Sequence, residues 1–508
     1  MGPSNGALAV GVAGGGADCG AASAAEASPP SQRPSGQKRP RLVGLDMLRG
    51  LTMAVMLLVD YAGTCYPSID HAPWNGIHLA DFVMPFFLWV SGVSMSISLR
   101  VRPGESPWKV FATAARRAVR LFLLGIVVQG GWYRLEKGMP VLRFDLSTVR
   151  WLGILQRIAL AFLLLAAAEL LPPRARAEAA AAAGGERLLP PAGAAELAVQ
   201  REFHGFAAPF RARGPQWCVA LAAAALGIVL TYGVRPPDSW AGCAPSVYLC
   251  ADSAAGCTSQ EDEDQLKQMG CSAVGFLDSH VLGVSHTYIR GSKVPSWPPT
   301  WGFDPEGLVT TCSAVLPMAF GLHIGFVWRA LRDVQKVLLH WLVLGVALTA
   351  FASVLSIWVP LNKRLWSPSY SLLMCGLAAL IYSGLFLVVD ASAVLPASLR
   401  RFSRWAKAIL SPLQWLGENC ILFFVLSDCC GVLDLLLRSI TWGKPYTEKN
   451  VVAWFQNTVL MQWFGLGSSC AGMYAECGPA VMTYVWIEIL LWVIVCGVLH
   501  RQGIFWKI

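Results

Sequence analysis

Long apolar runs separated by short polar segments dominate this chain. Windows of roughly 20 mainly apolar residues are long enough to cross a bilayer as an α-helix. Glu418, Asp428 and Asp434 interrupt one of these runs, near the C-terminus. The pattern predicts an all-α fold, a polytopic membrane helix bundle of about ten transmembrane helices. The predicted spans are residues 42–62, 78–99, 112–132, 150–171, 217–234, 308–328, 337–359, 368–390, 411–436 and 479–499.

The segments between these runs predict the domain organisation. Residues 1–40 are rich in small residues and proline, which is typical of a disordered tail, and the Ala-rich insert at 172–216 has little to pack as a core. Trp and Phe recur at helical spacing near 450–466, which favours an amphipathic helix on the membrane interface. The predicted division is 1–40, 41–171 with four spans, 172–216, 217–234, the long loop 235–305, and 306–508 with the remaining spans.

Composition and charge agree with a membrane protein and predict its orientation. Hydrophobic residues make up 55% of the chain and charged residues 14%, which excludes an ordinary soluble protein of this length. Basic residues gather before the first span, between the second and third, and after the sixth and eighth. With ten spans these positions share one side, which the positive-inside rule makes the cytosol, together with both termini. The net charge of +9 therefore indicates topology and implies no nucleic-acid partner.

Four of the 15 cysteines cluster in the 235–305 loop, which this topology places in the lumen. An oxidising lumen would allow two disulfides among Cys243, Cys250, Cys257 and Cys271, with the pairing left open. No tight C-x-x-C pair occurs among them, so no metal site is predicted.

The most informative polar segment is His71-Ala-Pro-Trp-Asn-Gly-Ile-His-Leu-Ala-Asp81, between the first two spans. Ionisable groups at the edge of a membrane are costly and are usually functional. Histidine, with an ordinary pKa of about 6.5, serves as a general base or an acyl-accepting nucleophile near neutral pH. His71 is therefore a candidate catalytic residue. Asp81 has a simpler alternative role, because a carboxylate at a helix start interacts favourably with the helix dipole.

Other polar groups lie within or beside the apolar runs. Asp46 and Arg49 are three residues apart and share a helix face, where they can pair. Arg157 lies inside the fourth span and must face the bundle interior or a water-filled cavity, so its partner is an anionic ligand or a carboxylate. Asn362 and Lys363 open the eighth span, either as an interfacial anchor or as part of a site.

Motifs for several enzyme classes are absent from the sequence. It contains no G-x-x-x-x-G-K-[ST], G-x-S-x-G, H-E-x-x-H or Rossmann-type glycine fingerprint in a sensible context. Nucleotide hydrolysis and zinc proteolysis are therefore not expected.

The longer motifs carry a family resemblance. R-L-V-G-L-D-M-L-R-G-L-T-M-A-V-M at 41–56 and H-A-P-W-N-G-I-H-L-A-D-F-V-M-P-F-F-L-W-V-S-G at 71–92 resemble the heparan-alpha-glucosaminide N-acetyltransferase family. Similar elements follow in order: V-R-W-L-G-I-L-Q-R-I-A at 149–159, F-D-P-E-G at 303–307, P-L-N-K-R-L-W-S-P-S-Y at 360–370 and I-F-W-K-I at 504–508. The resemblance covers most of residues 41–508 and looks like a shorter branch that lacks the lumenal N-terminal domain.

The resemblance implies a transmembrane acetyltransferase. Such an enzyme takes acetyl-CoA from the cytosol as co-substrate, needs no metal, and acetylates a glucosamine-type amino sugar in the lumen of a lysosome or vacuole. By motif the family's active-site histidine falls on His71, with direct transfer favoured over an acetyl-histidine intermediate. Acetyl-CoA would place its thioester near His71 and Asn75, and Trp74 would pack on the sugar or the pantetheine.

The remaining candidate residues follow from position or motif, and two depart from the family pattern. Asp46, Arg49 and Arg157 would shape the acetyl-CoA path, and Asp81 would orient His71 or His78. Asn419 is the family asparagine of G-E-N-C-I-L at 417–422. Asp60 and Ser427 stand where animal members carry Asn and His, so the acceptor need not be heparan sulfate. An O-acetyltransferase acting on another glycan, a small-molecule transporter, a plasma-membrane location and a homodimer remain open alternatives. A transporter would predict internal repeats, and none is seen.

Overall fold

A computed structural model describes residues 41–99, 106–129, 133–136, 139–142, 145–170, 206–237, 269–290, 298–331, 333–427, 440–443, 449–464 and 478–506. The predicted tail at 1–40 and most of the predicted insert at 172–216 lie outside these ranges, as do Cys243, Cys250 and Cys257. Cys271 is disulfide-bonded, and its partner also lies outside the described residues.

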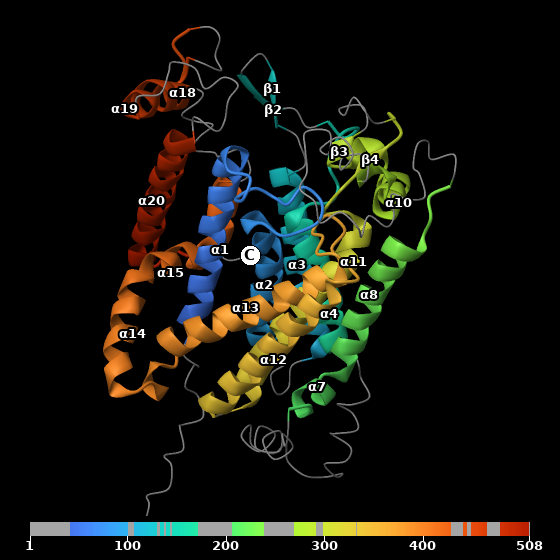
Figure 1. Cartoon of the computed structure of the whole chain (residues 1–508), viewed down its shortest axis with the longest axis vertical. Helices are drawn as coiled ribbons and strands as arrows, with labels where there is room; N and C mark the ends of the chain where they lie inside the picture. Colours follow the sequence, from blue (N-terminus) through green and yellow to red (C-terminus); the bar gives the residue numbers. More distant parts are fainter. Residues whose placement is uncertain are drawn as a thin grey trace, which may run out of the picture. The chain divides into compact units, whose positions relative to one another are not determined.

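Long α-helices occupy most of the predicted spans, as Figure 1 shows. Six of the described helices are long and apolar enough to cross a membrane, including η2 with α2 as one continuous segment. The prediction of an all-α membrane helix bundle is therefore confirmed. The helices are α1 (Val43–Ala62), α2 (Val83–Ser98), α3 (Pro107–Gln129), α4 (Ile154–Leu170), α8 (Gly214–Gly233), α11 (Leu308–Ala330), α12 (Val334–Leu355), α13 (Pro368–Val389) and α20 (Gly478–Gln502).

The ninth predicted span is not one continuous helix. It divides into α15 (Ser411–Glu418) and α16 (Cys420–Ser427), and the rest of the predicted segment lies outside the described residues. Asn419 separates the two helices, and its side chain hydrogen-bonds the backbone of Ile504 and Trp506, near the C-terminus. The amphipathic helix α14 (Ala397–Ile409) precedes α15.

Glycines allow the central helices to approach closely. A Cβ atom at Gly92 on α2 would lie 2.0 Å from the carbonyl oxygen of Met318 on α11, and one at Gly417 on α15 would lie 1.8 Å from that of Asp46 on α1. Small residues at such crossings are typical of membrane helix bundles. As a result α1 packs among α2, α13, α15 and α20. We name the two ends of the bundle after residues near the two ends of α1. The Arg41 end is where α1 begins, and the His71 end is where α1 ends.

Short elements fill the connections, and the sequence pattern predicted none of the strands. β1 (Tyr133–Glu136) pairs with β2 (Met139–Leu142), and β3 (Ile289–Arg290) pairs with β4 (Gly302–Phe303), both antiparallel. Strands of two to four residues are too short to show the alternation that identifies a strand in sequence. The other short elements are η1 (Gly63–Cys65), η2 (Leu79–Phe82), α7 (Ala208–Ala212), α10 (Ala273–Leu282), η4 (Val284–His286) and η6 (Ser392–Val394).

Two of the segments between the long helices also contain ordered structure. Residues from the predicted loop 235–305 pack a small apolar cluster that includes Cys271, Trp301 and Phe303. The segment predicted as an interfacial helix is helical over α18 (Val451–Trp454), a π-helical turn at Phe455–Leu460 and α19 (Met461–Trp463). Its position on the membrane interface stays a prediction.

Candidate active site and pocket

A buried carboxylate holds His71 in place at the His71 end of the bundle. The Nδ1 atom of His71 lies 3.0 Å from Oδ1 of Asp81, which has no exposed side-chain surface. The other oxygen of Asp81 accepts the backbone N–H groups of Ala72 at 3.1 Å and His78 at 2.9 Å. Because these bonds fix the carboxylate, its free oxygen is available to orient the imidazole of His71.

A loop from a distant part of the chain completes this group of residues. Nζ of Lys363 lies 2.8 Å from Nδ1 of His71 and 3.6 Å from Oδ1 of Asp81. Asn362 donates from its side chain to Oδ1 of Asn75 at 3.2 Å. The structure therefore brings together two segments that the sequence suggested separately, the loop after α1 and the turn before α13.

The electrostatic surroundings favour a neutral imidazole. Burial lowers the pKa of His71, and the nearby ammonium of Lys363 lowers it further, whereas the hydrogen bond with Asp81 raises it. Burial also lowers the pKa of Lys363, to about 8, although Asp81 and Glu306 oppose this effect. Lys363 is therefore still mostly charged at neutral and acidic pH, while His71 is available as a base.

A buried ion-pair network lies between the start of α4 and the start of α11. Arg150 donates to both carboxylate oxygens of Asp304, at 2.9 and 2.5 Å, and to Glu306 at 2.5 Å. Burial alone would raise the pKa of Glu306, but Arg150 and Arg157 lower it to about 2. In the sequence, these residues lie within the family motifs at 149–159 and 303–307, and the charged positions of those motifs are the only signal for the network.

Arg157 faces the bundle interior, as its position in an apolar helix required. Its guanidinium donates to the carbonyl oxygen of Pro305 and the hydroxyl of Thr310, both at 2.5 Å, and lies 4.6 Å from the ring centre of Trp366. It also lies within the electrostatic reach of Asp304 and Glu306. Arg157 thus connects α4 to the start of α11. A contact between Arg157 and acetyl-CoA stays a prediction.

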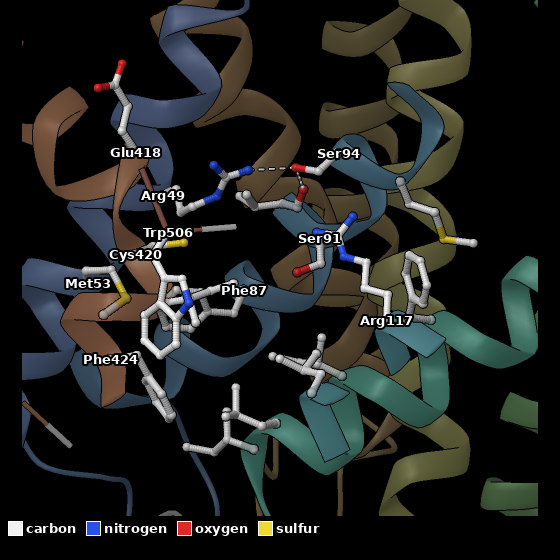
Figure 2. Close-up of a pocket in the computed structure, with 18 of the residues that line it drawn as sticks. Arg49, Met53, Phe87, Ser91, Ser94, Arg117, Glu418, Cys420, Phe424 and Trp506 are labelled. Atoms are coloured by element: carbon white, nitrogen blue, oxygen red, sulfur yellow. Dashed lines mark hydrogen bonds between the residues drawn. The ribbon is translucent and has the colours of Figure 1, made fainter. Parts of the chain in front are cut away.

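A separate pocket of about 230 Å³ opens into the bundle between α1, α2, α3, α4 and α16 (Figure 2). Arg49 and Arg117 lie on its walls, and Met53, Phe87 and Phe424 are among its apolar lining residues. The pocket therefore combines positive charge with an apolar interior.

The predicted pair of Asp46 and Arg49 is present at this pocket. Nη1 of Arg49 donates to Asp46 at 2.8 Å, and Nη2 donates to the hydroxyl of Ser94 at 2.7 Å. Arg41 also donates to Asp46, at 2.5 Å. These bonds hold the guanidinium of Arg49 at the pocket wall.

Asn419 contributes to the pocket indirectly. Its side chain donates to the carbonyl oxygen of Ile504 at 3.2 Å and accepts the N–H of Trp506 at 3.1 Å, and the side chain of Trp506 lines the pocket. Arg117 and Trp506 are site residues that the sequence pattern did not predict. The available signals were the basic cluster before the third span and the terminal I-F-W-K-I motif.

The two groups of candidate residues lie at different levels of the bundle. The pocket lining on α1 reaches Met53, nine residues before Ala62, which corresponds to about 14 Å of helix. The group of residues around His71 lies beyond that end and consists of His71, Asn75, Asp81, Asn362 and Lys363. Arg49 lines the pocket instead, and Asp46 and Asn419 hydrogen-bond residues that line it.

The remaining candidate residues have other surroundings. Asp60 is exposed on the last turns of α1, and Trp74 packs against the cluster around Trp301 and Phe303. Ser427 is buried on α16. Among the described residues, no group of three or more His, Cys, Asp or Glu side chains is arranged to hold a metal ion.

Comparison with known proteins places these residues in a family context. Residues 41–189 match the family model described as "Heparan-alpha-glucosaminide N-acetyltransferase, catalytic". A human protein named heparan-alpha-glucosaminide N-acetyltransferase is 26% identical over 480 residues, or 92% of this chain and 60% of the human protein. Its mouse counterpart of the same name is 24% identical over 490 residues, or 94% of this chain and 62% of the mouse protein. The chain thus spans about three-fifths of the curated relatives it matches. These matches confirm the resemblance that the motifs indicated, and along nearly its whole length this chain is similar to the heparan-alpha-glucosaminide N-acetyltransferase family.

Proposed function

We propose that this protein is a membrane-embedded acetyltransferase that moves an acetyl group from acetyl-CoA to a glucosamine-type amino sugar. The names of the two relatives support the reaction class. The observation that carries the proposal is the contact of His71 with the buried carboxylate of Asp81, within the part of the chain that matches the catalytic family model. Acetyl-CoA enters from the Arg41 end, which faces the cytosol, and the sugar binds at the His71 end, in the lumen of a lysosome or vacuole.

The pocket has the properties that acetyl-CoA requires. Guanidinium groups suit phosphate oxygens because they donate several hydrogen bonds in a plane and remain charged. Arg49 and Arg117 supply such groups, and the apolar lining beyond them suits the pantetheine arm. An extended arm directed from this pocket toward the end of α1 would bring the thioester toward His71.

The chemistry at His71 follows from its contacts. Nδ1 lies within reach of both Asp81 and Lys363. In the tautomer in which Nδ1 donates to Asp81, Lys363 makes no hydrogen bond to Nδ1, and the lone pair on Nε2 accepts a proton from the sugar amine as the amine nitrogen attacks the thioester carbonyl. The carbon–nitrogen bond forms first and gives a tetrahedral intermediate. When this intermediate collapses, the carbon–sulfur bond breaks and CoA leaves as the thiolate, which takes the proton back from the imidazolium. The ammonium of Lys363, 2.8 Å from the imidazole, adds positive charge that stabilises the oxyanion of the tetrahedral intermediate.

The test is a transfer assay with the purified full chain in detergent. Acetyl-CoA labelled in its acetyl group is offered with glucosamine, galactosamine and N-acetylglucosamine, which has hydroxyls but no free amine. Label in the amino sugars, with one CoA released per acetyl group transferred, supports the proposal. Label in N-acetylglucosamine alone would indicate O-acetylation, and sugar uptake into liposomes without CoA release would indicate a transporter.

Lys363→Met is expected to change the pH dependence of the reaction. Removing the ammonium raises the pKa of His71 toward its ordinary value, because the charge of Lys363 is one of the causes that lower it. His71 then becomes protonated at higher pH, so the acidic fall in kcat/KM moves up by roughly half to one pH unit. The measurement is kcat/KM from pH 4.5 to 8, with Lys336→Met, an exposed lysine on α12, as the control. An acidic limb that stays in place or moves to lower pH would contradict the assigned role of Lys363.

A further inference from the structure

The helix α14 lies at the Arg41 end of the bundle. Asp390, directly after α13, accepts the backbone N–H of Val43 at 2.9 Å and that of Gly44 at 2.8 Å, so α13 ends where α1 begins. α14 starts at Ala397, seven residues later, and its main contacts are with α13, η6 and α15. Figure 1 shows it in orange beside α15.

One face of α14 is apolar and open. Leu399, Phe402, Trp405 and Ile409 are spaced by three or four residues and form one stripe along the helix. These residues are 47, 61, 66 and 70% exposed, respectively. The inner side of the helix is marked instead by Ser403, which is buried and donates to the carbonyl oxygen of Val388. The stripe therefore contributes little to packing against α13, and a large apolar surface is left uncovered.

The opposite face of α14 is strongly basic. Arg400, Arg401, Arg404 and Lys407 are all exposed, and the 13-residue helix contains no acidic side chain. On a helical wheel these four positions centre nearly opposite the apolar stripe. A short helix with an aromatic-rich apolar face and a face of Lys and Arg has the composition of helices that lie in a membrane interface.

We propose that α14 is a docking surface for a bilayer that contains anionic phospholipids. The helix lies parallel to the membrane, with Phe402 and Trp405 among the acyl chains and the arginines at the headgroup phosphates. A bilayer is the occupant because α14 begins a few residues after α13 and contacts it. Since α13 is a helix long and apolar enough to span the membrane, the lipid surface is already beside α14. The anionic headgroup follows from the four positive charges of α14, which contains no acidic side chain; of the four, Lys407 also lies within the electrostatic reach of Asp390. This inference does not depend on the proposed acetyltransferase activity.

Hydrogen exchange in the intact protein tests the proposal. The full chain is placed in nanodiscs of phosphatidylcholine alone or with 30% phosphatidylserine, and amide exchange is followed by mass spectrometry for the peptide covering 397–409. We expect exchange in this peptide to be about tenfold slower in the discs that contain phosphatidylserine, because each basic side chain near an anionic surface adds a favourable interaction. High salt should remove most of the difference.

Two double variants with equal loss of charge separate lipid binding from a general charge effect. Arg401→Gln with Arg404→Gln should remove most of the slowing by phosphatidylserine, whereas Lys336→Gln with Arg501→Gln, at exposed positions on α12 and α20, should keep it. Phe402→Ser with Trp405→Ser should give fast exchange in both kinds of disc. The proposal would be overturned by equal exchange in the two lipid mixtures. It would also be overturned if both charge variants lost the slowing by phosphatidylserine to the same extent. Slowing that appears only after an acidic protein is added would assign the surface to a protein partner and would overturn it as well.

Discussion

His71→Ala is expected to lower kcat/KM for acetyl transfer by about 10²–10⁴-fold. The imidazole is the group that Asp81 orients at the His71 end of the bundle, and the ammonium of Lys363 lies beside it. Affinity for acetyl-CoA should change little, because His71 is not among the residues that line the pocket containing Arg49 and Arg117. The measurements are initial rates of labelled acetyl transfer and, separately, equilibrium binding of acetyl-CoA.

A matched histidine variant controls for a general effect of the substitution. His280 is exposed on α10, and its ring contacts the carbonyl oxygen of Phe276 in the same helix. His280→Ala should therefore keep the rate of the unmodified protein within about twofold. If His71→Ala also kept that rate, His71 would have no part in the transfer step.

The same preparations distinguish direct transfer from a covalent acetyl-histidine. In direct transfer the carbon–sulfur bond breaks only when the amine attacks, so acetyl-CoA without acceptor should release no CoA in the time of one turnover. A burst of CoA equal to the amount of enzyme, absent from His71→Ala, would show that an acetyl group is held on His71. We expect no burst.

The helices were predictable from the sequence because each apolar run contains its own signal. The start and end of α1, α11 and α13 lie within a few residues of the predicted spans. The interruption of the ninth span was not predictable in this way. At the interruption, Asn419 contacts the backbone of Ile504, 85 residues further along the chain, and such a contact is defined only by the folded structure.

The candidate site was predictable to the extent that its residues lie in one segment. His71 and Asp81 are ten residues apart in a single loop, where ionisable groups at a membrane edge are already informative. The contact between His71 and Lys363 joins residues 292 positions apart, and no local pattern indicates it. Arg117 shows a different difficulty: its charge is explained equally well by membrane topology, so its position at the pocket wall gives no separate signal.

Arg150→Met is expected to destabilise the folded protein by ~3–5 kcal/mol, because it leaves buried carboxylates without their main positive partner. Asp304 has no exposed side-chain surface and Glu306 has little, and both accept from Nη2 of Arg150 at 2.5 Å. In the unfolded state, water solvates the carboxylates of Asp304 and Glu306. Loss of Arg150 therefore raises the free energy of the folded state more than that of the unfolded state. The measurement is the unfolding temperature in detergent at pH 7, where a clear decrease is expected.

Two further variants show whether the effect comes from the unpaired charges. Arg116→Met removes an exposed arginine of α3 whose hydrogen bond is to Thr113 one turn away, and should leave the unfolding temperature nearly unchanged. Adding Asp304→Asn and Glu306→Gln to Arg150→Met removes the buried negative charges and should restore part of the loss, because the neutral amides still fill the same space. If the triple variant were less stable than Arg150→Met, the shape of the Arg150 side chain would matter more than its charge. The contacts between the starts of α4 and α11 would then depend on packing around Arg150.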